Sequence, residues 1–107
     1  MDSEKIKDDI CDAIARRKVI QFYYKNKPRI AEPYICGESY ANKYVLLAFQ
    51  TGGYSSSRKF GWKLFDLSNI AVLKITETEF NVSGEERRRY DPIDPRIKKT
   101  FCCIPKP

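Results

Sequence analysis

The strongest constraint on the fold is a change in the hydrophobic period at Lys18. Before this residue, isoleucines recur every four positions between Ile6 and Ile14, which places them on one face of an α-helix. After it, the stretch VIQFYYK (19–25) alternates between its two faces, as a half-buried β-strand does. The sequence therefore predicts one N-terminal helix over residues 3–17, followed by strands.

Five extended segments follow the predicted helix and are separated by short turns; they are residues 19–25, 29–36, 44–50, 58–67 and 70–80. Pro33 interrupts the second segment and indicates an edge strand or a bulge, because proline cannot donate to a sheet ladder. Strands joined by short hairpins commonly close into a small barrel, which removes exposed edges. We expect a mainly β protein of the α+β class, with a small five-stranded antiparallel barrel over residues 18–80 and the helix over one open end.

The length of 107 residues is typical of a single domain. Residues 81–107 are rich in proline and predict an extended tail that packs on the barrel, with TFCCI (100–104) as a candidate last strand. No stretch approaches the roughly 20 apolar residues that cross a bilayer, and the polar, acidic start is unlike a secretory signal peptide. We therefore expect a cytoplasmic protein that does not contact membranes.

Four cysteines bear on redox state and metal binding: Cys11, Cys36, Cys102 and Cys103. None lies in a CxxC pair, and the chain has no histidine, which argues against a zinc site. Two disulfides are one alternative, but reduced thiols are the commoner state in proteins without an export signal. We expect four reduced cysteines, no metal and no cofactor.

The composition argues against an enzyme. The absence of histidine removes the commonest general base, and no glycine-rich phosphate loop is present. Glu32 and Asp66 could in principle form a carboxylate pair, but nothing in the sequence places them together. A binding module is the better hypothesis.

Positive charge is concentrated in the first part of the predicted sheet. The net charge is +6 overall, but residues 13–63 carry +8 and residues 1–12 carry −3. Such a field attracts phosphates before any specific contact forms, and aromatic residues interleaved with it offer stacking faces for bases. The alternative is a basic domain whose charge serves only solubility.

The order of the segments also resembles the WYL domain, a bacterial module named for a Trp-Tyr-Leu triad. The triad position falls on Tyr44, Val45 and Leu46, and the family's small–aromatic pair follows as residues 48–49. Other matching positions are Ala13, Ile14, Tyr24, Arg29 and Pro33 upstream, and Lys63, Phe65, Leu67 and Ile70 within KLFDLSNI downstream. The chain departs from the pattern at Val45, Asp66, Ser68 and Asn69, and two of these replace arginines of the family.

The resemblance implies an Sm-like small barrel and a ligand-sensing role in transcription regulation or in phage and CRISPR defence. The implied ligand is single-stranded nucleic acid or a nucleotide, and the candidate protein partners are a regulator, a defence protein or a second copy of the chain. Most WYL domains adjoin a helix-turn-helix domain, whereas this chain resembles a stand-alone WYL protein. The alternative is a structural or protein-interaction barrel that has lost its ligand pocket.

The candidate ligand-binding residues combine the resemblance with the charge pattern. Arg29 could grip a phosphate with its planar fork, and Lys63 supplies a second cation. Aromatic and basic residues elsewhere in the positive region complete the set, which is Arg29, Lys63, Tyr24, Tyr44, Arg16, Arg17, Arg58, Lys59 and Trp62. For each of them the alternative is core packing or a solvated surface charge.

Overall fold

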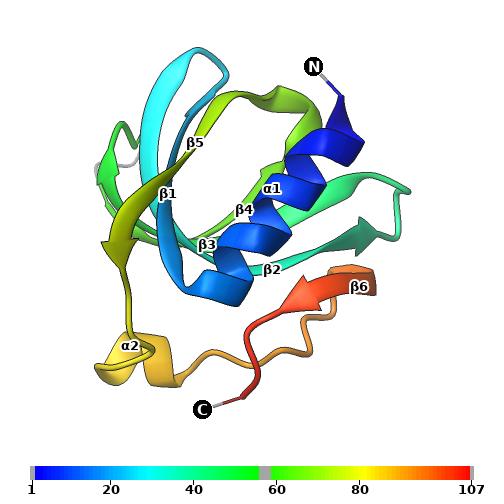
Figure 1. Ribbon diagram of the computed structural model, residues 1–107. Coiled ribbons are helices and arrows are strands. Elements are labelled where there is room, and N and C mark those ends of the chain that lie inside the picture. The colour runs from blue at the N-terminus through cyan, green and yellow to red at the C-terminus, as the bar shows by residue number, and fades with distance from the viewer. Residues whose placement is uncertain (1, 56–58, 107) are drawn as a thin grey trace.

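The computed structural model describes residues 2–55 and 59–106, and it begins with the predicted helix (Figure 1). Helix α1 spans Ser3–Arg16. The Asp2 carboxylate caps its start by accepting a hydrogen bond of 3.0 Å from the Glu4 amide. Arg17 ends it in the left-handed conformation, with φ 57°. The isoleucine face is buried against the sheet, as its spacing predicts.

One antiparallel sheet of six strands forms the rest of the fold. The chain therefore is mainly β with an N-terminal helix, as predicted. Five strands lie in the order β4-β3-β2-β1-β5, and the sixth pairs with β2 beyond the end of β1. Their bounds are β1 Lys18–Tyr24, β2 Lys27–Ser39, β3 Tyr44–Gly53, β4 Gly61–Asp66, β5 Ile70–Glu79 and β6 Ile97–Cys103.

The sheet is not closed into a barrel, so the expected closure is wrong. Within the described residues, β4 and β5 are the two edges and no ladder joins them. A 3-10 turn, Leu67–Asn69, links these edges. The side chain of Leu67 is fully buried and belongs to the core cluster.

The short link nevertheless forces the sheet to curl strongly. The edges of a flat five-stranded sheet would lie about 19 Å apart, whereas the steps from Asp66 to Ile70 span at most about 14 Å. Two hydrogen bonds hold the curl at this end. The Asp66 amide donates to the Tyr24 hydroxyl at 3.1 Å, and the Lys25 amide donates to the Asn69 carbonyl at 3.2 Å. Strand β1 is thereby brought next to the end of β4.

Pro33 lies in the central strand β2, so the edge-strand alternative is wrong and the bulge is confirmed. On one side of β2, pairing with β1 ends at Ala31 and pairing with β6 begins at Ile35. On the other side, the register with β3 shifts between Pro33 and Ile35. The proline therefore occupies the point where the missing amide hydrogen is least costly.

The tail after β5 folds back along β2 and contains helix α2 (Glu85–Arg88) and β6. Arg87 makes two hydrogen bonds, of 2.8 and 3.0 Å, to the buried Glu32 carboxylate, and its guanidinium lies 4.2 Å from the Phe49 ring centroid. The Tyr90 hydroxyl donates to the Ile104 carbonyl at 2.6 Å. Within the run RRR (87–89), Arg87 is therefore an anchor of the tail and not a solvated charge.

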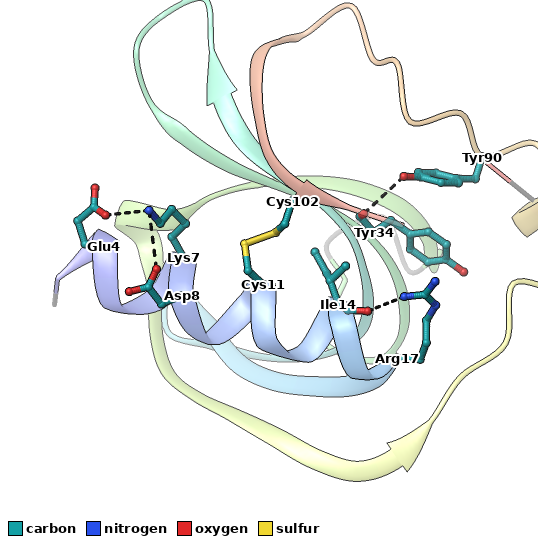
Figure 2. Close-up of a disulfide and its surroundings, with 9 residues drawn as sticks. All are labelled: Glu4, Lys7, Asp8, Cys11, Ile14, Arg17, Tyr34, Tyr90 and Cys102. Carbon is teal, nitrogen blue, oxygen red and sulfur yellow. Dashed lines mark hydrogen bonds and ion pairs between the residues drawn. A yellow bond between two sulfur atoms is a disulfide. The ribbon is translucent and has the colours of Figure 1, made fainter. Parts of the chain in front are cut away.

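A disulfide joins Cys11 of α1 to Cys102 of β6, with a Cα–Cα distance of 5.8 Å (Figure 2). The prediction of four reduced cysteines is therefore wrong for this pair, while Cys36 and Cys103 are free thiols. The two bonded residues are 91 positions apart and meet only because β6 pairs with β2 beside the helix. Among the described residues, no helix has the length and apolar character needed to cross a membrane.

Candidate anion-binding site

A pocket of about 380 Å³ opens between the β1–β2 hairpin, strand β4 and the segment after β3. We call it the cationic pocket, because four of its side chains are basic and none is acidic. It brings together three predicted residues, Tyr24, Arg29 and Lys63. The full lining is Tyr24, Lys25, Lys27, Arg29, Tyr54, Ser55, Lys63, Leu64 and Phe65.

The hairpin between β1 and β2 sets the position of two of the lysines. Lys25 and Asn26 adopt positive φ angles of 51° and 66°, as the central residues of a tight hairpin turn do. Tyr24 faces Lys27 across the hairpin, and Phe22 faces Arg29. Because alternate residues of a strand point to the same face, the side chains of Lys27 and Arg29 both point to the inner face of the curled sheet.

Gly53 allows β3 to approach the hairpin closely. It pairs with Arg29 and has a φ of 81°. A Cβ atom at this position would lie 2.4 Å from the Pro28 carbonyl oxygen. The next residue, Tyr54, donates its amide hydrogen to the same carbonyl at 2.7 Å. This contact fixes the Tyr54 ring at the border of the pocket.

Arg29 is the central residue of the pocket and is partly buried, so it is not a solvated strand-end charge. Its guanidinium carbon lies 5.4 Å from the ring centroid of Tyr24, 5.5 Å from that of Tyr54 and 5.8 Å from that of Phe65. One terminal nitrogen donates a long hydrogen bond of 3.5 Å to the Gln50 side-chain oxygen. The Arg29 Nε atom is buried and has no hydrogen-bond partner. The aromatic rings thus hold the Arg29 guanidinium in place while some of its N–H donors make no hydrogen bond within the described chain.

Among the described residues, no ion pair involves any of the three lysines of the pocket. Lys63 donates a hydrogen bond of 3.4 Å to the Ser55 hydroxyl. The ammonium groups of Lys25 and Lys27 lie 5.7 and 5.1 Å from the ring centroids of Tyr24 and Tyr54. No carboxylate of the described chain lies within 4 Å of any of these ammonium groups. The pocket therefore carries a net positive charge that only a ligand or solvent ions can balance.

Sequence reasoning missed Lys25, Lys27, Tyr54 and Gln50 as members of the site. The turn KNKP is a recognisable hairpin signal and could have placed both lysines beside Arg29. Gln50 is fully buried, and its amide nitrogen donates to the carbonyls of Gly52 and Tyr54 at 2.9 and 2.7 Å. These bonds direct the side-chain oxygen of Gln50 toward Arg29. No local sequence pattern predicts that Gln50 accepts a hydrogen bond from Arg29.

Asp66, one of the departures from the WYL pattern, does not line the cationic pocket. Its carboxylate caps the 3-10 turn by accepting hydrogen bonds of 3.0 and 2.8 Å from the amide and hydroxyl of Ser68. Burial alone would raise the pKa of Asp66, but the Ser68 hydrogen bonds and the Lys43 charge outweigh burial and lower it. The departure from the WYL pattern at this position therefore leaves the pocket free of negative charge.

Three predicted residues lie at the two ends of α1 and not in the cationic pocket. The Tyr44 hydroxyl donates to the Glu4 carboxylate, which raises the pKa of Tyr44. Arg16 forms an ion pair of 3.0 Å with Asp12. Arg17 donates a hydrogen bond of 2.8 Å to the Ile14 carbonyl, as Figure 2 shows. Each has a local structural role.

The remaining predicted residues are Trp62, Lys59 and Arg58. The Trp62 indole donates to the Glu86 carbonyl at 3.3 Å, and its ring packs against Tyr34, Phe49 and Tyr90. Lys59 is exposed and its carbonyl accepts a hydrogen bond from Ser55. Arg58 lies outside the described residues. Trp62 thus belongs to the cluster that anchors the tail.

Comparisons with known proteins add no assignment. No protein-family model matches the chain, and no curated protein or solved structure matches it. The resemblance to WYL domains therefore rests on the order of the sequence segments. Within the described residues, no cluster of three or more cysteine, aspartate or glutamate side chains is arranged to hold a metal ion.

Proposed function

We propose that the protein is a non-enzymatic, WYL-like sensing module that binds single-stranded nucleic acid or a nucleotide through the cationic pocket. The single observation that carries this proposal is the convergence of Lys25, Lys27, Arg29 and Lys63, without a carboxylate, in one pocket of about 380 Å³. Pockets that hold small ligands have volumes of about 300–1,000 Å³. In this proposal the module serves transcription regulation or phage and CRISPR defence.

The chemistry of the pocket suits phosphate oxygens. The planar fork of Arg29 can offer two parallel donors to one phosphate, and the lysines act as flexible point charges. Each charged hydrogen bond contributes about 1.5–3 kcal/mol. The aromatic rings around Arg29 hold the guanidinium in place, so less conformational freedom is lost when the ligand binds.

Two further expectations belong to this proposal. The first is an Sm-like topology for the open, curled sheet, which the pairing of β1 with both β2 and β5 supports. The second is a cytoplasmic location, which requires the Cys11–Cys102 disulfide to persist in a reducing compartment, where disulfides are rare.

The proposal is tested by fluorescence anisotropy with a short labelled single-stranded oligonucleotide at several salt concentrations. With about three phosphates contacted, log K should fall against log salt with a slope of about −2. Arg29→Ala should weaken binding about tenfold or more, since tenfold corresponds to about 1.4 kcal/mol. Arg29→Lys should recover part of this loss, because the charge remains and the fork is absent.

Arg88→Ala is the matched control, because Arg88 is exposed on α2 and does not line the pocket. Circular dichroism of each variant separates lost binding from lost folding. If Arg88→Ala weakens binding as much as Arg29→Ala, the attraction is diffuse and the pocket is not a site. If the unmodified protein does not bind even at low salt, the alternative of a structural or protein-interaction module replaces this proposal.

A further inference from the structure

We infer that the cationic pocket recognises a terminal polyphosphate, such as the triphosphate of a free nucleotide or of an RNA 5′ end. This inference rests on the proposed function and narrows its ligand from phosphates in general to one chemical class. Three observations carry it: the number of cations in one small volume, the occupied faces of the aromatic rings, and the unpaired donor of Arg29.

The charge in the pocket exceeds what one internal phosphate can balance. Four basic side chains line about 380 Å³, and no acid lines it. A phosphodiester in a single strand carries one negative charge, and its neighbours lie further along the strand. A terminal phosphate alone carries about −1.5 to −2 at neutral pH, and each phosphate linked to it adds charge in the same small space. A terminal di- or triphosphate therefore matches the four cations better than a continuous strand.

Cations lie over the aromatic rings of the pocket, which reduces the ring surface that is available for stacking on a base. The Arg29 guanidinium lies against the rings of Tyr24, Tyr54 and Phe65. Lys25 lies over the Tyr24 ring and Lys27 over the Tyr54 ring. The base of a nucleotide would therefore remain outside the pocket, and recognition should be independent of base identity.

Arg29 has hydrogen-bonding capacity that the protein leaves unused. Its buried Nε has no partner, and its one side-chain hydrogen bond, to Gln50, is long at 3.5 Å. A buried donor is normally satisfied by protein, water or ligand. Nε itself is shielded by the surrounding protein, so a phosphate would contact the terminal nitrogens of Arg29, which carry more N–H donors than the one bond to Gln50 uses.

The test compares three RNA oligonucleotides of identical sequence that end in a 5′-hydroxyl, a 5′-monophosphate or a 5′-triphosphate. Affinity is measured by anisotropy with a 3′ label, and inorganic tripolyphosphate and ATP are titrated as competitors. We expect the triphosphate to bind at least tenfold more tightly than the hydroxyl, and tripolyphosphate to compete. Changing the RNA sequence should alter the affinity less than twofold.

The Lys25→Gln/Lys27→Gln double variant should abolish most of the preference for the triphosphate. Its charge-matched control is Lys74→Gln/Arg88→Gln, which removes two exposed cations from β5 and α2 and should retain the preference. Both lysines of the test variant lie on the exposed hairpin, so a folded protein is expected and is checked by circular dichroism.

The possible outcomes separate the inference from the proposed function. Equal affinity for the three RNAs, all weakened by Arg29→Lys, would overturn the inference and leave a site for internal phosphates. Binding of ATP as tight as that of the triphosphate RNA supports a free nucleotide as the source, and much tighter binding of the RNA supports a strand end. If neither the RNAs nor tripolyphosphate bind at low salt, both the inference and the proposed function fail.

Discussion

Breaking the Cys11–Cys102 disulfide should remove a large part of the stability of the fold. The bonded residues are 91 positions apart. In the chain-entropy model, a cross-link that closes a loop of that length lowers the entropy of the denatured chain and raises its free energy by about 4.6 kcal/mol at 25 °C. Unfolding entropy of about 2.1 cal/mol/K per residue converts this loss, for 107 residues, into a fall of about 20 °C in the melting temperature. The folded state itself should change little, because the β2–β6 ladder and the buried isoleucine face of α1 remain.

The assay is urea unfolding at 25 °C, with and without a reductant, followed by circular dichroism. The measurement is made on Cys103→Ser protein, because the adjacent free thiol Cys103 could otherwise pair with Cys11. A Cys11→Ala/Cys102→Ala variant on the same background separates loss of the bond from effects of the reductant. The m-value should rise on reduction, because a denatured chain without the cross-link exposes more surface.

A loss of stability below about 1 kcal/mol in both comparisons would refute the entropic reasoning, since natural disulfides typically contribute about 2–5 kcal/mol. Alkylation of the unsubstituted protein, denatured without reduction, gives an independent check by mass spectrometry. Two modified cysteines are expected, and four would show that the bond does not form.

Three further predictions concern the tail, the buried thiol and tyrosine hydroxyls, and the pocket. Arg87→Ala should destabilise the fold by about 3 kcal/mol in urea unfolding, because it leaves the buried Glu32 carboxylate without its cation, although the Tyr34 hydroxyl still donates to it. Arg89→Ala, whose ion pair is exposed, should cost less than about 1 kcal/mol. Burial raises the pKa of Cys36 from 9.0 to about 12 and also raises the pKa values of Tyr34 and Tyr90, so the unfolded chain releases these protons first. Between about pH 7 and pH 8.5 stability should therefore be constant, and it should fall as the pH rises from there toward 12; a flat urea midpoint between pH 8 and 11 would contradict this. Gly53→Ala should weaken both stability and oligonucleotide binding, because its positive φ and the Pro28 carbonyl at 2.4 Å exclude a Cβ, whereas Gly84→Ala, which also has a positive φ but open space around it, should leave binding unchanged.

The elements of the fold could be predicted from local sequence patterns. The period of four in the isoleucines gave the helix, and the period of two after Lys18 gave strands close to those observed. Closure of the sheet could not be predicted in this way, because it depends on whether β4 and β5 pair. The structure has no β4–β5 ladder among its described residues, and the pairing of two strands is decided by contacts over the whole sheet that no single segment of the sequence shows.

The candidate site could also be predicted only in part, because some of its residues follow a local sequence pattern and others meet only in the folded chain. Arg29, Lys63 and Tyr24 were identified from the charge pattern and the WYL resemblance, and the curled sheet brings them together. The rings around Arg29 and the oxygen of Gln50 come from three different strands and a loop, so no single segment reveals them. The disulfide was missed because its spacing of 91 residues has meaning only once β6 lies beside α1.

The strand order also determines when each part of the chain can find its partner during synthesis. On the side away from β2, strand β1 pairs with β5, so Ile20 cannot pair with Ile75 until β5 has been made. Helix α1 likewise cannot contact β6 until this strand, the last in the chain order, has been made. At about 5–20 residues per second, the ribosome adds the 91 residues between Cys11 and Cys102 in roughly 5–18 s. Throughout that interval the Cys11 thiol lacks its partner, so the cross-link between α1 and the sheet cannot form until β6 has been made.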